Sequence, residues 1–297
     1  MIPHKESLRR KMIITRRCKA CGEQLPDHSG RGRKSDYCPP PKGCKYRAYR
    51  ERKEFRGETV PRNKPHLDLI YCAGDNERLT RMAYEAGLLI GIRSGRSAHN
   101  FPVSFVDIEY KRPNFEKHLK AIARYQPKYA TVLDLSDTEV SKQDIARAMM
   151  QYEQVLLCSS RTIPLIVPKL YGQVALLPDH VAIGYSIPTS YGGAKDVKLW
   201  ELEGRRIHLL GGSPQKQIEI YRTLSVEASI MSVDGNMAQL MATQFAKYWD
   251  GDWVEHPQRN TNTPDLYLDC WRRSCENIRR AWGKIVDLQP GQLTLVS

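Results

Sequence analysis

The sequence predicts an α/β fold, a TIM-type (β/α)8 barrel preceded by a small zinc-binding domain with four cysteine ligands. Three observations lead to this prediction. Eight short apolar runs alternate with stretches of helical character over about 170 residues. Four of the eight cysteines fall within residues 18–44 at the spacing of a metal site. The chain is strongly basic before residue 66 and nearly neutral after it, so we place a basic zinc-binding module at 1–65 and the barrel with a C-terminal helix at 66–297.

The candidate strands are short runs rich in Val, Ile and Leu, and most are followed by a helical stretch. They cover residues 67–73, 89–93, 103–107, 130–134, 165–168, 181–185, 207–210 and 228–233. A doubly wound open sheet accommodates the same alternation. No Gly-x-Gly-x-x-Gly follows the first strand, however, so a dinucleotide site has no support.

Start signals mark two of the predicted helices. Pro113 precedes the helix at 114–125. Ser141 stands at the N-cap of the helix at 141–155, with Asp144 at the capping-box position. The remaining predicted helices cover residues 76–86, 214–224, 237–248 and 266–282.

The net charge of +13 is concentrated in the N-terminal segment. Residues 1–65 hold 19 Lys or Arg against 7 Asp or Glu, a net of +12, whereas the rest holds 27 against 26. This concentration favours a nucleic-acid partner over a solvated basic tail. A membrane partner is not expected, because no amphipathic helix with a wide apolar face accompanies the charge. With no bilayer-length apolar run and no signal peptide, we expect a cytoplasmic protein.

The N-terminal cysteines have the spacing of zinc ligands. Cys18 and Cys21 form a Cys-x2-Cys pair, and Cys38 and Cys44 follow with five residues between them. Thiolates bind a tetrahedral zinc ion strongly, and a segment this polar needs a metal to fold. The sequence therefore predicts one structural Zn2+ on these four cysteines. The alternative is four free thiols in a disordered tail.

Two predicted strands end in an aspartate, Asp107 and Asp134, and Asp234 directly follows a third. A barrel builds its active site at the carboxyl ends of its strands, so these side chains would converge on one mouth. Each aspartate alone is more often a helix cap or a turn residue. The occurrence of all three at the ends of strands in one barrel favours a catalytic role.

Several segments, taken in order, resemble the tRNA-guanine transglycosylase superfamily. Residues 207–239 resemble the segment between an HYLMG-like strand and the nucleophilic aspartate, and TVLDLSD resembles the strand with the base-reading aspartate. IPLIVPK and AIGYSIP resemble the strands that carry IVQG and AVGG. The elements VSFVDIEYKRPNFEKHL, ATVLDL, HLLGGSP and SVDGN are most similar to the phage and bacterial 7-deazaguanine DNA transglycosylases. The resemblance covers roughly residues 67–250.

The resemblance implies a glycosyltransferase, more narrowly a pentosyltransferase, that exchanges guanine in DNA for a 7-deazaguanine such as 7-cyano-7-deazaguanine. It implies Asp234 as the nucleophile of a covalent aspartyl-nucleotide, Asp107 as general acid and base, and Asp134 as the ligand of the flipped base. DNA and the free 7-deazaguanine base would be the partners, in the host cytoplasm if a phage encodes the chain. The backbone positions that would approach the base are Gly184, Tyr185, Gly211 and Gly212.

Two features depart from the superfamily. Pro168, followed by Lys169, replaces the glutamine of IVQG. The C-terminal zinc site of the tRNA enzymes is missing, since Cys270 and Cys275 are spaced as neighbours on a helix. The alternatives are the same exchange on tRNA, a non-catalytic zinc-dependent nucleic-acid-binding protein, and a Mg2+-dependent DNA nuclease. The sequence leaves the oligomeric state open.

Overall fold

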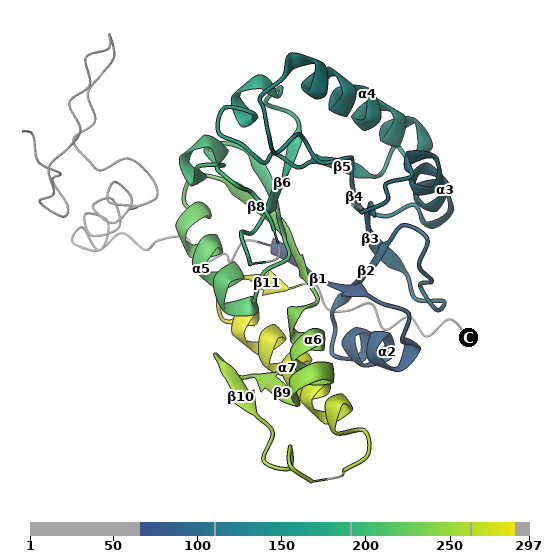
Figure 1. The fold of residues 1–297 in the computed structure, drawn as a ribbon, viewed down its shortest axis with the longest axis vertical. Coiled ribbons are helices and arrows are strands. Elements are labelled where there is room, and N and C mark those ends of the chain that lie inside the picture. Colours follow the sequence, from purple (N-terminus) through teal and green to yellow (C-terminus); the bar gives the residue numbers. More distant parts are fainter. Residues whose placement is uncertain (1–65, 110, 191, 262, 289–297) are drawn as a thin grey trace, which may run out of the picture. The chain divides into compact units, whose positions relative to one another are not determined.

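The computed structural model describes residues 66–109, 111–190, 192–261 and 263–288. Eight strands run parallel in chain order from β1 to β8, and β8 pairs with β1, so the sheet closes into a barrel. Figure 1 shows the ring of strands with the helices around its outside. The predicted α/β barrel is therefore confirmed, whereas the predicted N-terminal zinc-binding domain and its boundary at residue 65 lie outside the described residues.

The eight barrel strands are three to eight residues long and lie close to their predicted positions. They are β1 (His66–Ala73), β2 (Leu89–Arg93), β3 (Val103–Asp107), β4 (Tyr129–Thr131), β5 (Ile163–Ile166), β6 (Ala182–Ser186), β7 (Arg206–Leu210) and β8 (Ser229–Gly235). Two ends differ from the prediction in a way that matters for the site. Strand β4 stops at Thr131, so Asp134 lies in the following loop, and β5 stops at Ile166, before Pro168.

The helices cover the barrel, but three connections between strands contain no α-helix, the first being the loop at residues 94–102 between β2 and β3. They are α2 (Glu77–Glu85), α3 (Phe115–Tyr125), α4 (Lys142–Cys158), α5 (Pro214–Leu224), α6 (Met237–Phe245) and α7 (Leu266–Gly283). Between β5 and β6, and between β6 and β7, the described residues contain only the short 3-10 helices η1 (Val174–Leu176) and η2 (Leu199–Leu202). The barrel is thus thinly covered next to β6.

Side-chain caps mark the start of four of the described α-helices, α2 to α5. Asn114 accepts a hydrogen bond from the Lys117 amide at the start of α3, one residue after Pro113. Ser141 caps α4 as predicted. Asp144 does not complete a capping box, because its carboxylate accepts from the Ser136 amide instead.

The C-terminal region differs from the sequence prediction at one helix. The helix expected at 237–248 ends at Phe245, because Ala246 adopts a left-handed conformation with φ of 50°. The next residues form the antiparallel hairpin β9 (Lys247–Trp249) and β10 (Trp253–Glu255). A short final strand, β11 (Asp287–Leu288), pairs in parallel with the start of β1.

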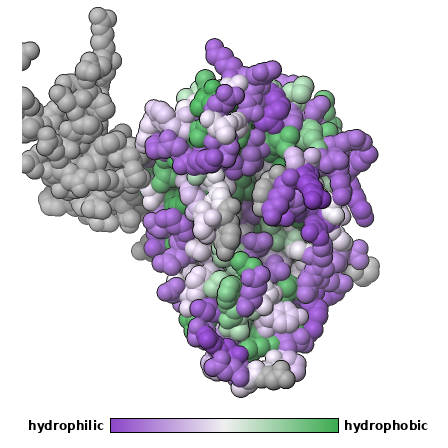
Figure 2. Space-filling model, viewed as in Figure 1, coloured by the Kyte–Doolittle hydropathy of each residue, from purple (hydrophilic) through white to green (hydrophobic). Residues whose placement is uncertain are grey.

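The core has two layers. Ile70, Phe105, Tyr129, Leu165 and Ala182 fill the inside of the barrel, and a larger apolar layer lies between the strands and the helices. Hydrophilic residues predominate on the face shown in Figure 2, and hydrophobic ones occur in small separate groups. None of the helices in the described ranges has the length and apolarity needed to cross a membrane.

Candidate active site

Two of the predicted aspartates lie together at the carboxyl ends of the barrel strands. Asp107 is the last residue of β3, and Asp234 is the sixth of the seven residues of β8. They are close enough that the negative charge of Asp234 raises the pKa of Asp107. This mouth of the barrel is where the active sites of such folds are built.

The carboxylate of Asp234 is held at both oxygens. Cys72 in β1 donates its S–H to Oδ2 over 2.8 Å. The Gly211 amide donates to Oδ1 over 3.1 Å, and His208 Nε2 lies 3.2 Å from the same oxygen. The side chain of Gln217 donates to the Asp234 backbone carbonyl over 2.7 Å. With only 7% of Asp234 exposed, these contacts fix the orientation of the carboxylate.

The local backbone explains how Gly211 reaches Asp234. Gly211 has a φ of +68°, a left-handed conformation that glycine adopts without a steric penalty. It lies directly after β7, beside the end of β8. The chain leaves the strand at this position, and the Gly211 amide donates to the carboxylate of Asp234.

The pKa of Asp107 is far above its ordinary value. Burial and the charge of Asp234 raise the pKa of Asp107 from 3.8 to about 7, against the hydroxyl of Thr131, which donates to Oδ1 over 3.0 Å and lowers it. A carboxyl group that is half protonated near neutral pH is suited to both giving and taking a proton.

Cys72 is a hydrogen-bond donor at this site. Burial, followed by the charges of Asp234 and Asp107, raises the pKa of its thiol well above the usual range. The sulfur therefore keeps its proton near neutral pH. In this protonated form it donates to Asp234, and it is a poor nucleophile because only the thiolate reacts.

A line of polar contacts runs from Asp234 into the barrel. The Nδ1 atom of His208 lies 2.6 Å from the Ser232 hydroxyl, and its ring packs against Phe105 with 4.7 Å between centroids. Ser232 in turn contacts the hydroxyl of Tyr129. His208 is fully buried, so the carboxylate of Asp234 lies against an imidazole that is fixed by its neighbours.

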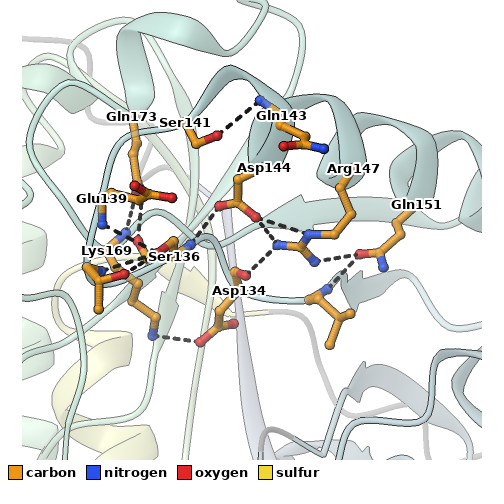
Figure 3. A network of polar contacts seen from close by, with 12 residues as sticks. Asp134, Ser136, Glu139, Ser141, Gln143, Asp144, Arg147, Gln151, Lys169 and Gln173 are labelled. Atoms are coloured by element: carbon orange, nitrogen blue, oxygen red, sulfur yellow. Dashed lines mark hydrogen bonds and ion pairs between the residues drawn. The ribbon is translucent and has the colours of Figure 1, made fainter.

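Asp134 lies at the same mouth but has a different partner. Its Oδ2 forms an ion pair with Lys169 Nζ over 2.7 Å. Figure 3 shows the two side chains pointing toward one another from the loops after β4 and β5. The negative charge of Asp134 is near enough to contribute to the raised pKa of Asp107.

Residues 83–283 match the model of a protein family described as a family of unknown function (DUF6610). The chain belongs to this family. No curated protein matches the chain. Two solved structures of low similarity are a truncated form of 3-deoxy-D-arabino-heptulosonate 7-phosphate synthase from Thermotoga maritima and a GGGPS from Thermoplasma volcanium. The first is 10% identical with a TM-score of 0.38, covering 80% of this chain and 97% of its own. The second is 12% identical with a TM-score of 0.32, covering 73% and 93%.

The remaining predicted site residues of this DUF6610 barrel are divided between the mouth and the core. Gly211 holds Asp234, and Gly212 follows it with a φ of +81°. Gly184 lies inside the barrel, where an added Cβ would come within 2.9 Å of Leu210 and Val167. Tyr185 belongs to the apolar layer around the barrel. The structure therefore gives Gly184 and Tyr185 packing roles, and does not bring the Tyr185 ring to the mouth.

The predicted zinc ligands lie outside the described residues. The site on Cys18, Cys21, Cys38 and Cys44 therefore stays a prediction. Among residues 66–288, where described, no group of three or more His, Cys, Asp or Glu side chains is placed to hold a metal ion.

Sequence reasoning missed Cys72 and His208 as partners of Asp234. Cys72 is 162 residues from Asp234, and only the pairing of β1 with β8 brings the two strands together. His208 lies in the segment HLLGGSP, whose glycines drew attention ahead of its histidine. The inward direction of both side chains is a property of the closed barrel.

Proposed function

We propose that this protein exchanges a purine base in nucleic acid through a covalent intermediate on Asp234. The observation that carries the proposal is the pair of carboxyl groups at one mouth. Asp234 is held at both oxygens, and Asp107 has a pKa of about 7. Two carboxyl groups in such different environments suit nucleophilic attack by one and proton transfer by the other.

The first half of the reaction would cleave the bond between the base and the sugar. An oxygen of Asp234 attacks the anomeric carbon, and the electron pair of the glycosidic bond leaves with the purine. Asp107, in its protonated form, gives its proton to the departing base. The products of this half are a free purine, an ester between Asp234 and the sugar, and an ionised Asp107.

The second half would reverse these steps with another base. The ionised Asp107 removes a proton from the incoming base, whose nitrogen then attacks the anomeric carbon and expels Asp234. Both carboxyl groups return to their initial states, and the exchange consumes no redox cofactor and no nucleoside triphosphate. The nucleotide must leave the base stack before Asp234 can reach its anomeric carbon.

The finer assignment rests on sequence. The resemblance to 7-deazaguanine DNA transglycosylases supports guanine in DNA as the base removed and a 7-deazaguanine as the base inserted. The net charge of +12 in residues 1–65 supports a nucleic-acid partner. Exchange of the same base in tRNA is the alternative, and the experiment below distinguishes the two substrates.

The deciding experiment measures incorporation of labelled guanine into duplex DNA and into tRNA by the wild type and by Asp234→Asn. We expect incorporation into DNA by the wild type, none by the variant, and a denaturation-resistant protein–DNA adduct with the wild type only. The asparagine is nearly the same size as aspartate but a far weaker nucleophile, so the loss should be chemical. Exchange that persists in Asp234→Asn would refute the mechanism. Strand cleavage with Mg2+ in place of exchange would indicate a nuclease.

A further inference from the structure

Arg93 places a positive charge at the mouth of the barrel, and the proposed proton and glycosyl transfers do not use it. It is the last residue of β2 and lies opposite Asp107, the last residue of β3. Two residues earlier, Gly91 faces the inside of the barrel, since an added Cβ would come within 3.0 Å of Ile70 and Phe105. Side chains alternate along a strand, so Arg93 lies on the same inward face, at the mouth.

The charge of Arg93 reaches the carboxyl groups of the site. Burial and the charge of Asp234 raise the pKa of Asp107, and Arg93 acts in the opposite direction. Arg93 acts in the same direction on the thiol of Cys72, whose pKa is raised by burial and by the charge of Asp234. Arg93 forms an ion pair with Glu109, with 3.2 Å between Nη1 and Oε2. The guanidinium is thus held beside the site while the pKa of Asp107 stays at about 7.

The side chain of Arg93 is accessible to solvent. It is 38% exposed, whereas Lys169, which lies at the same mouth and is paired with Asp134, is only 13% exposed. A guanidinium carries five N–H donors in a planar fork that matches the oxygens of a phosphate. Arg93 therefore has the capacity to bind an anion from solvent while it remains paired with Glu109.

A second cation lies on the same side of the mouth. Lys117 is the third residue of α3, and a Cβ added at Gly95 would come within 2.5 Å of its Nζ. Gly95 follows Arg93 by two residues and has a φ of +88°. The loop after β2 and the start of α3 therefore place two positive charges close together.

The proposed substrate requires positive charge at this place. In a nucleic acid, the sugar whose anomeric carbon Asp234 would attack carries a phosphate on each side. These phosphates would approach the carboxylates of Asp234 and Asp134, and Asp107 is half ionised near neutral pH. Like charges repel strongly at short range in a partly buried site, so binding of the nucleotide needs a compensating cation.

We propose that Arg93 binds a backbone phosphate beside the reacting sugar, and that Lys117 adds to the positive potential there. This inference rests on the proposed base exchange, and it specifies the substrate class as a nucleotide within a phosphodiester chain, not a free nucleoside. Hydrogen bonds between a guanidinium and a phosphate are charge-assisted and stronger than those between neutral groups. Glu109 orients the guanidinium before the substrate arrives, which reduces the entropy lost on binding.

The test uses the full chain and compares binding of deoxyguanosine 3′,5′-bisphosphate and of deoxyguanosine by isothermal titration calorimetry. The wild type should bind the bisphosphate more tightly by about tenfold or more. Arg93→Met should lose most of this preference and keep its affinity for the nucleoside. Arg93→Lys keeps the charge but not the planar fork, so it should retain part of the preference.

Arg206→Met is the matched control, because it removes the same charge from the exposed start of β7, at the opposite end of the barrel. It should leave the preference for the bisphosphate unchanged. Glu109→Gln separates phosphate binding from a structural role of the ion pair. If Arg93 binds phosphate, this variant removes a competing negative charge and should keep or increase the preference. A loss of preference in Glu109→Gln as large as that in Arg93→Met would assign Arg93 a structural role and overturn the proposal.

Incorporation of labelled guanine into duplex DNA by the same variants separates this inference from base exchange. If the preference for the bisphosphate depends on Arg93 but no base is exchanged, the phosphate site stands and the base-exchange proposal fails. If guanine is exchanged but Arg93→Met keeps the wild-type preference, the phosphate site is wrong and base exchange stands. A wild type that binds the two ligands equally, or binds neither, also overturns the phosphate site.

Discussion

Buried carboxylates at the two ends of the barrel have opposite electrostatic surroundings. At the amino end of the strands, Asp68 is 1% exposed, and its Oδ2 is bound by Lys128 Nζ at 2.6 Å and by the Tyr129 hydroxyl at 2.8 Å. His66 contacts its other oxygen at 3.0 Å. At the carboxyl end, Asp107 and Asp234 lie near one another, and burial together with the charge of Asp234 raises the pKa of Asp107.

This difference distinguishes carboxylates that stabilise the fold from carboxylates that are suited to catalysis. A buried carboxylate with a cation and a hydroxyl as partners is electrostatically satisfied, and it contributes to holding the strands in register. Two like charges in one partly buried site are unfavourable, and such groups mark functional sites more often than structural ones. The expectation is that changes at the amino end alter stability, and that changes at the carboxyl end alter activity.

The largest effect is expected at the carboxyl end, on the rate of the first half-reaction in Asp107→Asn. Asp107→Asn cannot protonate the departing base, so we expect formation of the covalent adduct to slow by about 10²–10⁴-fold. The wild-type rate should fall as the pH rises through about 7, because Asp107 then loses its proton. Single-turnover rates of adduct formation between pH 5 and 9 measure both. A variant that retained the decline near pH 7 would assign the titration to another group.

The second prediction concerns the amino end. Asp68→Asn removes the charge that Lys128 and His66 contact, while its amide oxygen can still accept from Tyr129. We expect the free energy of unfolding to fall by about 1–3 kcal/mol, with the exchange rate per folded molecule unchanged. Urea denaturation measures the free energy of unfolding.

Asp137→Asn serves as its control, because the pair of Asp137 with Lys195 is half exposed, and solvent screening should leave its contribution to the free energy of unfolding much smaller. If Asp68→Asn instead lowered the exchange rate as strongly as Asp107→Asn does, the two ends of the barrel would not be functionally distinct.

The sequence predicted the barrel because its strands are short apolar runs, and that pattern follows from burial on both faces of a parallel sheet. Asp107 and Asp234 were found because strand ends are visible in such a pattern. The expected helix at 237–248 was too long, since the left-handed Ala246 that ends α6 has no signal in its residue type.

The partners of the site residues were not predictable in the same way. Ile70 of β1 lies opposite Asp234 of β8 only because the sheet closes on itself, and this register places Cys72 against the carboxylate. A break in register beside Ile207 and His208 further shifts the pairing of β7 with β8. Lys169 stood out in the sequence only as a departure from a glutamine, and its contact with Asp134 depends on where two loops end.

The smallest expected effect is on the pH dependence of stability at the carboxyl end. Unfolding returns the pKa of Asp107 from about 7 to its ordinary 3.8, so between these values the folded protein holds a proton that the unfolded chain has lost. The contribution of Asp107 to stability is therefore full below about pH 4 and is lost as the pH rises to about 7. The side chain in Asp107→Asn cannot ionise. The free energy of unfolding of the variant, relative to that of the wild type, should therefore rise by about 1–2 kcal/mol from pH 5 to pH 8, after allowance for partial exposure. Urea denaturation of both proteins at the two pH values measures this difference. A gap that stayed constant would mean that Asp107 ionises as freely as an ordinary aspartate, and the contrast between the two ends of the barrel would be lost.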